Sequence, residues 1–171
     1  MAELTYTERL QPSLLDRLTD EAPGDKTESR NRRVISMSRL RRLVRRDLAW
    51  LLNCGHMESL QDLEAYPEVQ RSVLNYGLPD LSGSAVSGLT EDQIERMVKN
   101  AILTYEPRIL PNSVRIRVDV SPGNFNRNAI VFEIVGQLWA QPMPTELFLK
   151  TELDIETGDI TVVDAAGGGT G

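Results

Sequence analysis

The hydrophobic period of the chain changes sharply within the stretch from Thr90 to Val120. In its first half apolar residues recur every three or four positions, which predicts a helix with one apolar face. In its second half they alternate with polar residues, which predicts a strand with one buried face. The apolar positions are Ile94, Met97, Val98, Ala101, Ile102 and Tyr105, then Val114, Ile116, Val118 and Val120. Because the chain is mostly helical in pattern before this stretch and mostly strand after it, we predict an α+β fold in which N-terminal helices pack on a small antiparallel β-sheet.

A rigid elbow, Glu106-Pro107-Arg108, separates the predicted helix from the predicted strand. Thr90 and Gln93 have the spacing of a capping box, which predicts the start of the helix. Pro107 ends it, because proline disfavours helical geometry in the preceding residue and donates no amide hydrogen bond. We therefore expect one carboxylate and one guanidinium a short distance apart on a fixed corner.

An earlier helix is predicted from about Met37 to Asn53, capped by Ser36 or Ser38. Projected on a helical wheel, its two sides are apolar (Leu40, Leu43, Val44, Leu48, Trp50, Leu51) and basic (Arg41, Arg42, Arg45, Arg46). Asp47 falls within the apolar side. A buried, unpaired carboxylate is costly, so we expect a cationic or amide partner there, or an opening to solvent. Our hypothesis is that Arg108 or a backbone amide near the elbow is the partner.

Strands are predicted at about 113–120, 129–140 and 146–155, and a hairpin turn at 156–159 leads into a strand from Ile160 to Val163. The strand at 146–155 alternates between an apolar side and a charged side. Such a strand stays unpaired at a sheet edge only if the edge is blunted or reserved for a partner. If it is the receiving edge, proline at Thr151 is expected to block strand addition.

The chain divides into three parts. We expect residues 1–35 to form an N-terminal arm, partly flexible, in which 13–18 has the pattern of a short helix. Residues 36–164 form the predicted domain, and 165–171 a flexible glycine-rich tail. Cys54 is the single cysteine, which excludes an internal disulfide and fits a reducing cytoplasm. The sequence lacks an apolar run of about eighteen residues and an N-terminal signal pattern, so we expect a soluble, unexported protein.

Charge is distributed unevenly around the net charge of -6. Between Arg30 and Arg46 there are eight arginines and no acidic residue, whereas Gly55–Arg96 holds eight acidic residues and two arginines. Such separation indicates surfaces of opposite sign that meet different partners, although solvated faces that aid solubility have the same appearance.

Residues that carry catalysis or bind cofactors are few. His56 and Cys54 are two positions apart at a helix end, where side chains do not face each other, so a catalytic dyad is disfavoured. One histidine and one cysteine are too few for the usual zinc sites, and the phosphate-binding patterns GxxxxGK[ST] and GxGxxG do not occur. We expect no cofactor, no metal and no small-molecule substrate.

Two other classes of function stay open as alternatives. A glycosidase needs two carboxylates, one with a raised pKa, whereas Arg108 beside Glu106 favours the charged form of that acid. The arginine-rich stretch suits a phosphate backbone by charge, but its one aromatic neighbour, Trp50, is predicted on the apolar side and not free to stack on bases. An acidic protein partner is therefore favoured over nucleic acid.

Four segments, in this order, resemble one protein family: LRRLVRRDLAWLLN, YPEVQRSVLNYGLPDL, YEPRIL and ELFLKTELDIETG. Together they look like the TssE family of baseplate subunits of bacterial type VI secretion systems. They are also similar to the related phage tail baseplate wedge proteins, which are sometimes labelled lysozyme-like. The resemblance covers roughly residues 36–158, and the elbow combined with the closing TELDIETG makes it fairly specific.

The resemblance implies a structural, non-enzymatic protein in a cytoplasmic baseplate at the inner membrane, without insertion into it. Family members lie beside the wedge subunits TssF and TssG and offer a small sheet to strands of the sheath subunits TssB and TssC. By motif, Glu106, Pro107 and Arg108 would contact the wedge core, and the strand at 146–155 would belong to the receiving sheet. A peptidoglycan-cleaving lysozyme-like enzyme and a nucleic-acid-binding adaptor remain the alternatives.

Charged positions on two predicted strands would set the register of incoming strands. The residues assigned to partner binding on these strands are Arg115, Arg117, Lys150, Thr151, Glu152 and Asp154. The alternative is that these side chains only pair with one another across the sheet. Which edge of the sheet is free does not follow from periodicity.

Overall fold

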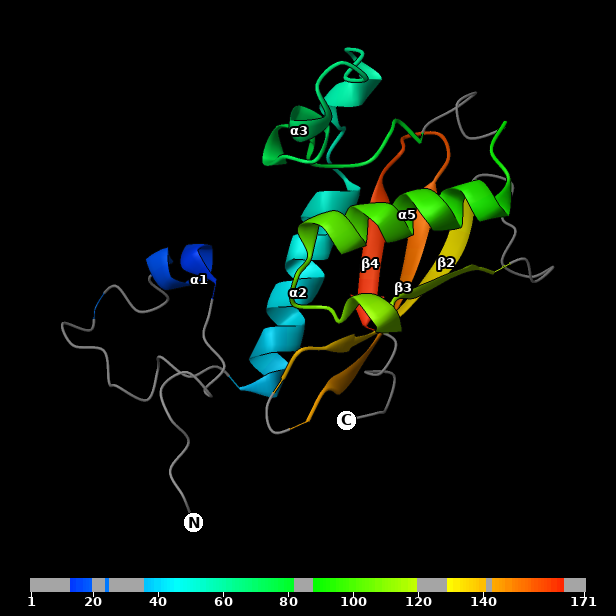
Figure 1. Ribbon diagram of the computed structural model, residues 1–171. Coiled ribbons are helices and arrows are strands. Elements are labelled where there is room, and N and C mark those ends of the chain that lie inside the picture. The colour runs from blue at the N-terminus through cyan, green and yellow to red at the C-terminus, as the bar shows by residue number, and fades with distance from the viewer. Residues whose placement is uncertain are drawn as a thin grey trace.

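The computed structural model describes residues 13–19, 24, 36–81, 88–119, 129–140 and 143–164. Two long helices lie against a four-stranded antiparallel sheet (Figure 1). Helix α5 (Glu91–Tyr105) crosses in front of the strands, and helix α2 (Met37–Leu52) runs beside the last strand (Figure 1). The predicted α+β class, with helices packed on a small antiparallel sheet, is confirmed.

Short elements complete the described fold. Helix α1 (Leu14–Leu18) lies to one side of α2 (Figure 1), and the sequence predicted a short helix in this segment. The segment between the long helices holds η3 (Met57–Ser59), α3 (Pro67–Gln70) and η4 (Val73–Asn75), and η5 (Pro111–Ser113) precedes the sheet. Within the described residues, none of these helices is long and apolar enough to cross a membrane.

The core lies between the long helices and the sheet. From α2 it takes Leu40, Leu43, Val44, Leu48, Leu51 and Leu52, and from α5 Ile94, Val98, Ala101 and Ile102. Each fully buried aliphatic side chain contributes about 1.5–3 kcal/mol of hydrophobic stabilisation. The capping box of Thr90 and Gln93 is confirmed, and α5 ends at Tyr105, one residue before the elbow.

Trp50 departs from the predicted pattern of α2. Its side chain is 52% exposed, and the guanidinium of Arg46 lies 4.7 Å from the centroid of its ring. Arg46 and Trp50 are four residues apart and therefore share one side of the helix. The assignment of Trp50 to the apolar side is wrong, because this part of α2 faces solvent and the ring is covered by a cation instead of by the core.

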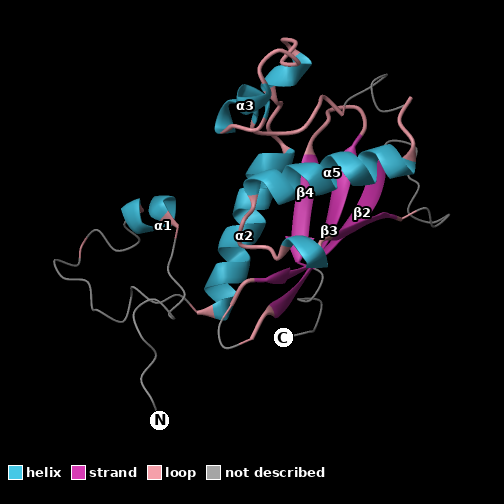
Figure 2. Ribbon diagram, viewed as in Figure 1, coloured by secondary structure: helices cyan, strands magenta, loops and turns pink. Residues whose placement is uncertain are grey.

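The sheet is an antiparallel meander in the order β1-β2-β3-β4 (Figure 2). Its strands are β1 (Arg115–Val118), β2 (Ala129–Leu138), β3 (Thr145–Asp154) and β4 (Ile160–Asp164). The predicted hairpin turn is present, with Gly158 at a φ of 79° and its N–H donating to the carbonyl of Asp154 at 2.8 Å. The predicted end of the first strand at Val120 lies outside the described residues.

The strand expected at 146–155 is β3, and it pairs with β2 on one side and with β4 on the other. The condition attached to proline at Thr151, that this strand is the receiving edge, is therefore not met in the described sheet. The alternating pattern of β3 reflects one buried face of an interior antiparallel strand, which periodicity does not distinguish from an edge strand. The two edges of the described sheet are β1 and β4.

Residues 53–81 form a side lobe that stands beyond one end of α2 (Figure 1). A parallel bridge between Gly55 and Leu78 holds its two ends together. Here the N–H of Leu78 donates to the carbonyl of Cys54 at 2.8 Å. Gly77 has a φ of 127°, and a Cβ at this position would lie 2.1 Å from the Cys54 carbonyl oxygen. Only glycine fits this crossing.

Candidate functional site

The elbow is held by backbone bonds to the end of β2. The N–H of Leu110 donates to the carbonyl of Gln137 at 2.8 Å, and the N–H of Trp139 donates to the carbonyl of Arg108 at 2.7 Å. These bonds flank an antiparallel bridge between Ile109 and Leu138. The chain leaving α5 is thus tied to the sheet at once, which fixes the position of the elbow relative to the core.

Within the elbow, the guanidinium of Arg108 forms a bidentate contact with the carboxylate of Glu106. Its Nε donates to Oε1 at 2.7 Å and its Nη2 donates to Oε2, while the backbone N–H of Arg108 also donates to Oε1 at 3.1 Å. Glu106 is only 4% exposed, so its carboxylate is satisfied almost entirely inside the protein. Paired bonds of this kind fix the plane of the guanidinium as well as its distance.

The same guanidinium also contacts Asp47, the acidic residue on the apolar side of α2. Nη2 of Arg108 lies 2.6 Å from Oδ2 of Asp47, across 61 positions of sequence. The hypothesis that Arg108 is the partner of Asp47 is confirmed. The two side chains are 25% and 22% exposed, so the pair lies at the surface above the buried Glu106.

The cluster extends beyond the elbow through Arg46. Its Nε donates to Oδ1 of Asp47 at 2.8 Å, and its Nη2 lies 2.8 Å from Oδ1 of Asp16 on α1. Asp16 has a side chain only 2% exposed, although it belongs to a five-residue helix in the N-terminal arm. We call the five residues Asp16, Arg46, Asp47, Arg108 and Glu106 the elbow cluster; their charges alternate in sign.

The sequence did not predict the contact between Asp16 and Arg46. The available signal is local: Ser13 caps α1, and its hydroxyl donates to Oδ2 of Asp16 at 2.6 Å. That spacing predicts a helix start but does not identify the distant arginine.

Electrostatics within the elbow cluster favour the charged form of every group with a resolved shift. Burial opposes the charge of Arg108, but Glu106 and then Asp47 outweigh it, so the pKa of Arg108 is raised above its ordinary value. Burial also opposes the ionisation of Asp16, but the hydrogen bond from Ser13 and the charge of Arg46 lower its pKa below the ordinary value. The ion pairs of the cluster therefore stabilise the charged forms of Asp16 and Arg108.

The charged residues predicted on the strands have different environments. Arg115 and Arg117 are exposed on β1, and the register places Arg117 opposite Glu133, with Lys150 on the far side of Glu133. The register thus gives Arg117 and Lys150 one acidic neighbour, Glu133, whereas Arg115 lies opposite Val135. Glu152 is exposed, and the register places it between Val131 and Thr161.

Two of the residues assigned to partner binding, Asp154 and Thr151, have structural roles within the fold. Oδ1 of Asp154 accepts hydrogen bonds from the backbone N–H groups of Glu156 and Thr157, at 2.8 and 3.1 Å, which builds the hairpin turn. Thr151 is fully buried, and its hydroxyl donates to the carbonyl of Phe132 at 2.6 Å. The side chain of Thr151 is thus inside the fold and not at a contact surface.

Both edges of the sheet are partly closed by side chains. On β1 the outward N–H of Val118 donates to Oε1 of Glu95 at 3.0 Å. On β4 the side-chain amide of Asn53 bonds both the N–H and the carbonyl of Ile160, each at 2.7 Å. Because outward groups alternate along a strand, the next main-chain groups on the open side of β4 are those of Val162.

An open groove runs along this part of β4. Val162 lines it from the strand, and α2 contributes the rest of the lining: Arg42, Leu43, Arg45, Arg46 and Ala49. Its volume is about 640 Å³. The basic side of α2 thus lines a groove beside the outer edge of β4, which pairs with no further strand in the described part of the chain.

Groups suited to catalysis remain scattered. Cys54 is exposed, and His56 Nε2 lies 3.5 Å from the Ser59 hydroxyl. No group of three or more potential metal ligands of the His, Cys, Asp and Glu types occurs in the described part of the chain.

The sequence profile of the family described as baseplate wedge protein gp25 matches residues 38–143, which include α2, the side lobe, α5, the elbow and β2. Neither the curated proteins nor the solved structures gave a significant match. The matched region is more than half of the chain and contains the elbow, so the predicted resemblance is confirmed. The chain belongs to the baseplate wedge protein gp25 family, which supports a structural role in a phage tail-like baseplate.

Proposed function

We propose that this protein is the TssE-type subunit of a type VI secretion baseplate, a structural component and not an enzyme. It docks onto the wedge subunits TssF and TssG through the elbow cluster and offers a strand edge to the sheath subunits TssB and TssC, on the cytoplasmic side of the inner membrane. The observation that carries this proposal is the elbow itself. It is an ion-paired corner held in position by backbone bonds, and its Arg108 and its partner Asp47 reach the surface.

The elbow suits binding because it is organised before a partner arrives. Glu106 is buried and holds Arg108, and Arg108 in turn fixes Asp47 at the surface. Side chains that are already immobilised lose little conformational entropy on association. Charged groups in a fixed arrangement also select a complementary partner and its orientation.

The β4 edge suits strand addition. Its outward groups at Val162 open onto the groove, whereas the outward N–H of Val118 on β1 is occupied by Glu95. An added strand gains affinity from main-chain hydrogen bonds and specificity from its alternate side chains. Arg42 and Arg45 beside the groove favour a segment with acidic side chains.

One reconstitution tests both parts. The protein is co-expressed with TssF, TssG, TssB and TssC, and co-purification with the wedge and the length of assembled sheath are measured. Arg108→Lys keeps the charge but loses the bidentate contact, so we expect weaker wedge co-purification. Val162→Pro removes an outward N–H without removing a bond to β3, so we expect intact wedge binding and fewer sheaths.

Matched controls test whether these effects are specific to the chosen changes. Arg96→Lys changes an exposed arginine on α5, and Val162→Thr keeps the outward N–H; both are expected to behave as wild type. Unchanged wedge co-purification by Arg108→Lys refutes docking through the elbow. Normal sheaths with Val162→Pro refute the β4 edge as the receiving site.

A further inference from the structure

The side lobe exposes large apolar side chains that the fold does not use. Leu60 is 92% exposed, Val73 79% and Leu74 64%, and Tyr66 is also exposed. Single exposed apolar residues are ordinary, but a concentration of them within one small lobe indicates an interaction surface. The lobe already has buried residues of its own, Leu63 and Leu78, so the exposed set is additional to its core.

The lobe presents this surface from a rigid frame. Asn75 is buried, its Oδ1 accepts from the N–H of Glu58 at 2.9 Å, and its Nδ2 donates to the carbonyl of Gln70 at 3.0 Å. The hydroxyl of Tyr105 on α5 lies 2.6 Å from the carbonyl of Asn75. These bonds lock η3, α3 and η4 to one another and to the long helix, so displaying the apolar side chains requires no rearrangement.

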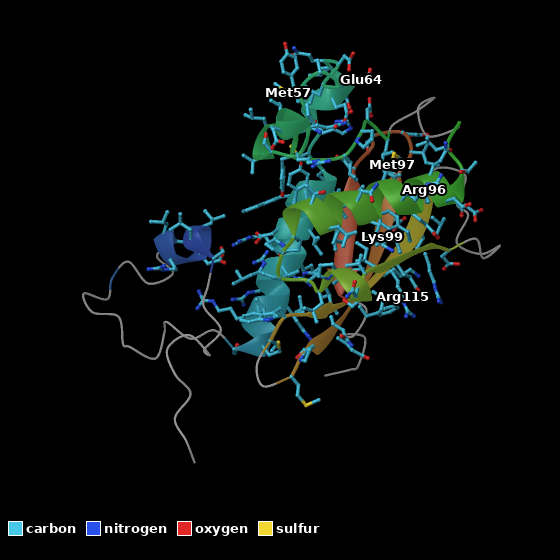
Figure 3. All side chains as sticks on the ribbon, viewed as in Figure 1. Met57, Glu64, Arg96, Met97, Lys99 and Arg115 are labelled. Atoms are coloured by element: carbon cyan, nitrogen blue, oxygen red, sulfur yellow. The ribbon has the colours of Figure 1, made fainter. Side chains whose placement is uncertain are left out.

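Charge identifies the kind of partner. The lobe exposes the carboxylates of Asp62, Glu64 and Glu68. Its sequence contains one arginine, Arg71, and no lysine. In Figure 3, Glu64 and Met57 lie on the lobe, above α5 and away from the sheet. A lobe that exposes both apolar side chains and carboxylates favours a segment that carries both apolar and basic side chains.

Position connects the lobe with the elbow. Tyr76 follows η4, and its hydroxyl donates to the backbone carbonyl of Asp47 at 3.4 Å. The rings of Tyr76 and Tyr105 pack edge to face with centroids 5.2 Å apart. A protein bound at the elbow cluster can therefore continue onto the lobe without crossing the sheet.

We propose that the side lobe is a second docking surface, which binds a basic segment with apolar side chains on a wedge subunit, next to the elbow contact. This proposal rests on the proposed function, because the partner is the wedge. It assigns to Leu60, Val73 and Leu74 the apolar contact and to Glu64 and Glu68 the selection of a basic partner.

The test measures the affinity of purified TssF–TssG complex for variants of the full chain. Leu60→Gln with Leu74→Gln removes exposed apolar surface, and we expect affinity at least tenfold weaker. Glu64→Gln with Glu68→Gln removes charge, and we expect weaker binding at low salt and a smaller dependence of affinity on salt. Val163→Gln is the matched control, because Val163 is 48% exposed on β4, outside both the lobe and the elbow cluster.

The outcomes separate the two proposals. If the wild-type chain binds the wedge and Arg108→Lys weakens it, while both lobe pairs bind as tightly as wild type, the lobe is not a docking surface and the proposed function stands. If the lobe pairs alone weaken binding, the lobe is supported and the elbow is refuted. If the wild-type chain does not bind the wedge, both proposals fail.

Discussion

At the scale of the residue, Asp47 is a position where the local sequence pattern predicts a tertiary contact. A carboxylate within the apolar side of a helix requires a partner, and the structure supplies two guanidiniums, from Arg46 and Arg108. Removing one member of such a network leaves the others desolvated without compensation, which costs more than the contact itself contributes. Asp16 extends this dependence to the arm, because its carboxylate is buried against Arg46.

The pH dependence of arm docking follows from Asp16. Its pKa is lowered in the folded protein, so its contribution to docking is complete above the ordinary carboxyl pKa and is lost as the pH falls through the lowered value. We expect the arm of the wild-type protein to become sensitive to proteolysis below about pH 4 while the domain stays folded. In Asp16→Asn the arm is expected to be sensitive already at neutral pH. If α1 of the wild-type protein stays protected from proteolysis at acidic pH, Asp16 does not have this role.

At the scale of the element, the side lobe depends on one backbone crossing. Gly77 adopts a positive φ, and a Cβ there would meet the carbonyl of Cys54, whose oxygen accepts the N–H of Leu78. The lobe is tied to the rest of the domain at this point. Loss of the crossing therefore affects the placement of η3, α3 and η4 together.

Gly77→Ala is expected to lower the free energy of unfolding by more than about 1 kcal/mol, because both the backbone conformation and the close contact exclude a side chain. Chemical denaturation measures this change. Gly55→Ala is the control, since no atom lies within 4 Å of a Cβ at that position. Equal stabilities of the two variants contradict the close crossing.

At the scale of the whole molecule, the described surfaces differ in the sign of their charge. The basic side of α2 faces the β4 edge, the elbow cluster lies at the end of α5, and the acidic side lobe stands beyond α2 (Figure 1). Glu106, the acid on the fixed corner, is bonded through both oxygens to Arg108 and is almost entirely buried. A general acid must instead reach the substrate and donate a proton.

We therefore predict that the protein does not cleave peptidoglycan. Purified protein incubated with cell-wall material is expected to release soluble fragments at the rate of buffer alone, with a commercial lysozyme as the positive control. Release of fragments by the wild type, abolished in Glu106→Gln, establishes a hydrolase and overturns the structural role.

The sequence by itself determined the features that depend on neighbours along the chain. These are the change of hydrophobic period, the capping box at Thr90, the end of the helix before Pro107, the hairpin turn at Gly158 and the anomalous place of Asp47 on the apolar side of its helix. Periodicity, caps and turns are local properties, so a short window contains all the information that fixes them.

Only the tertiary structure decided which strands are edges, where Trp50 points and which arginine meets Asp16. The order of strands depends on pairing between distant segments, and an interior antiparallel strand has the same alternation as an edge strand. The contact of Asp16 with Arg46 joins an arm to a helix without any fixed spacing. Such contacts depend on how the finished elements pack, and for that reason the sequence pattern left them open.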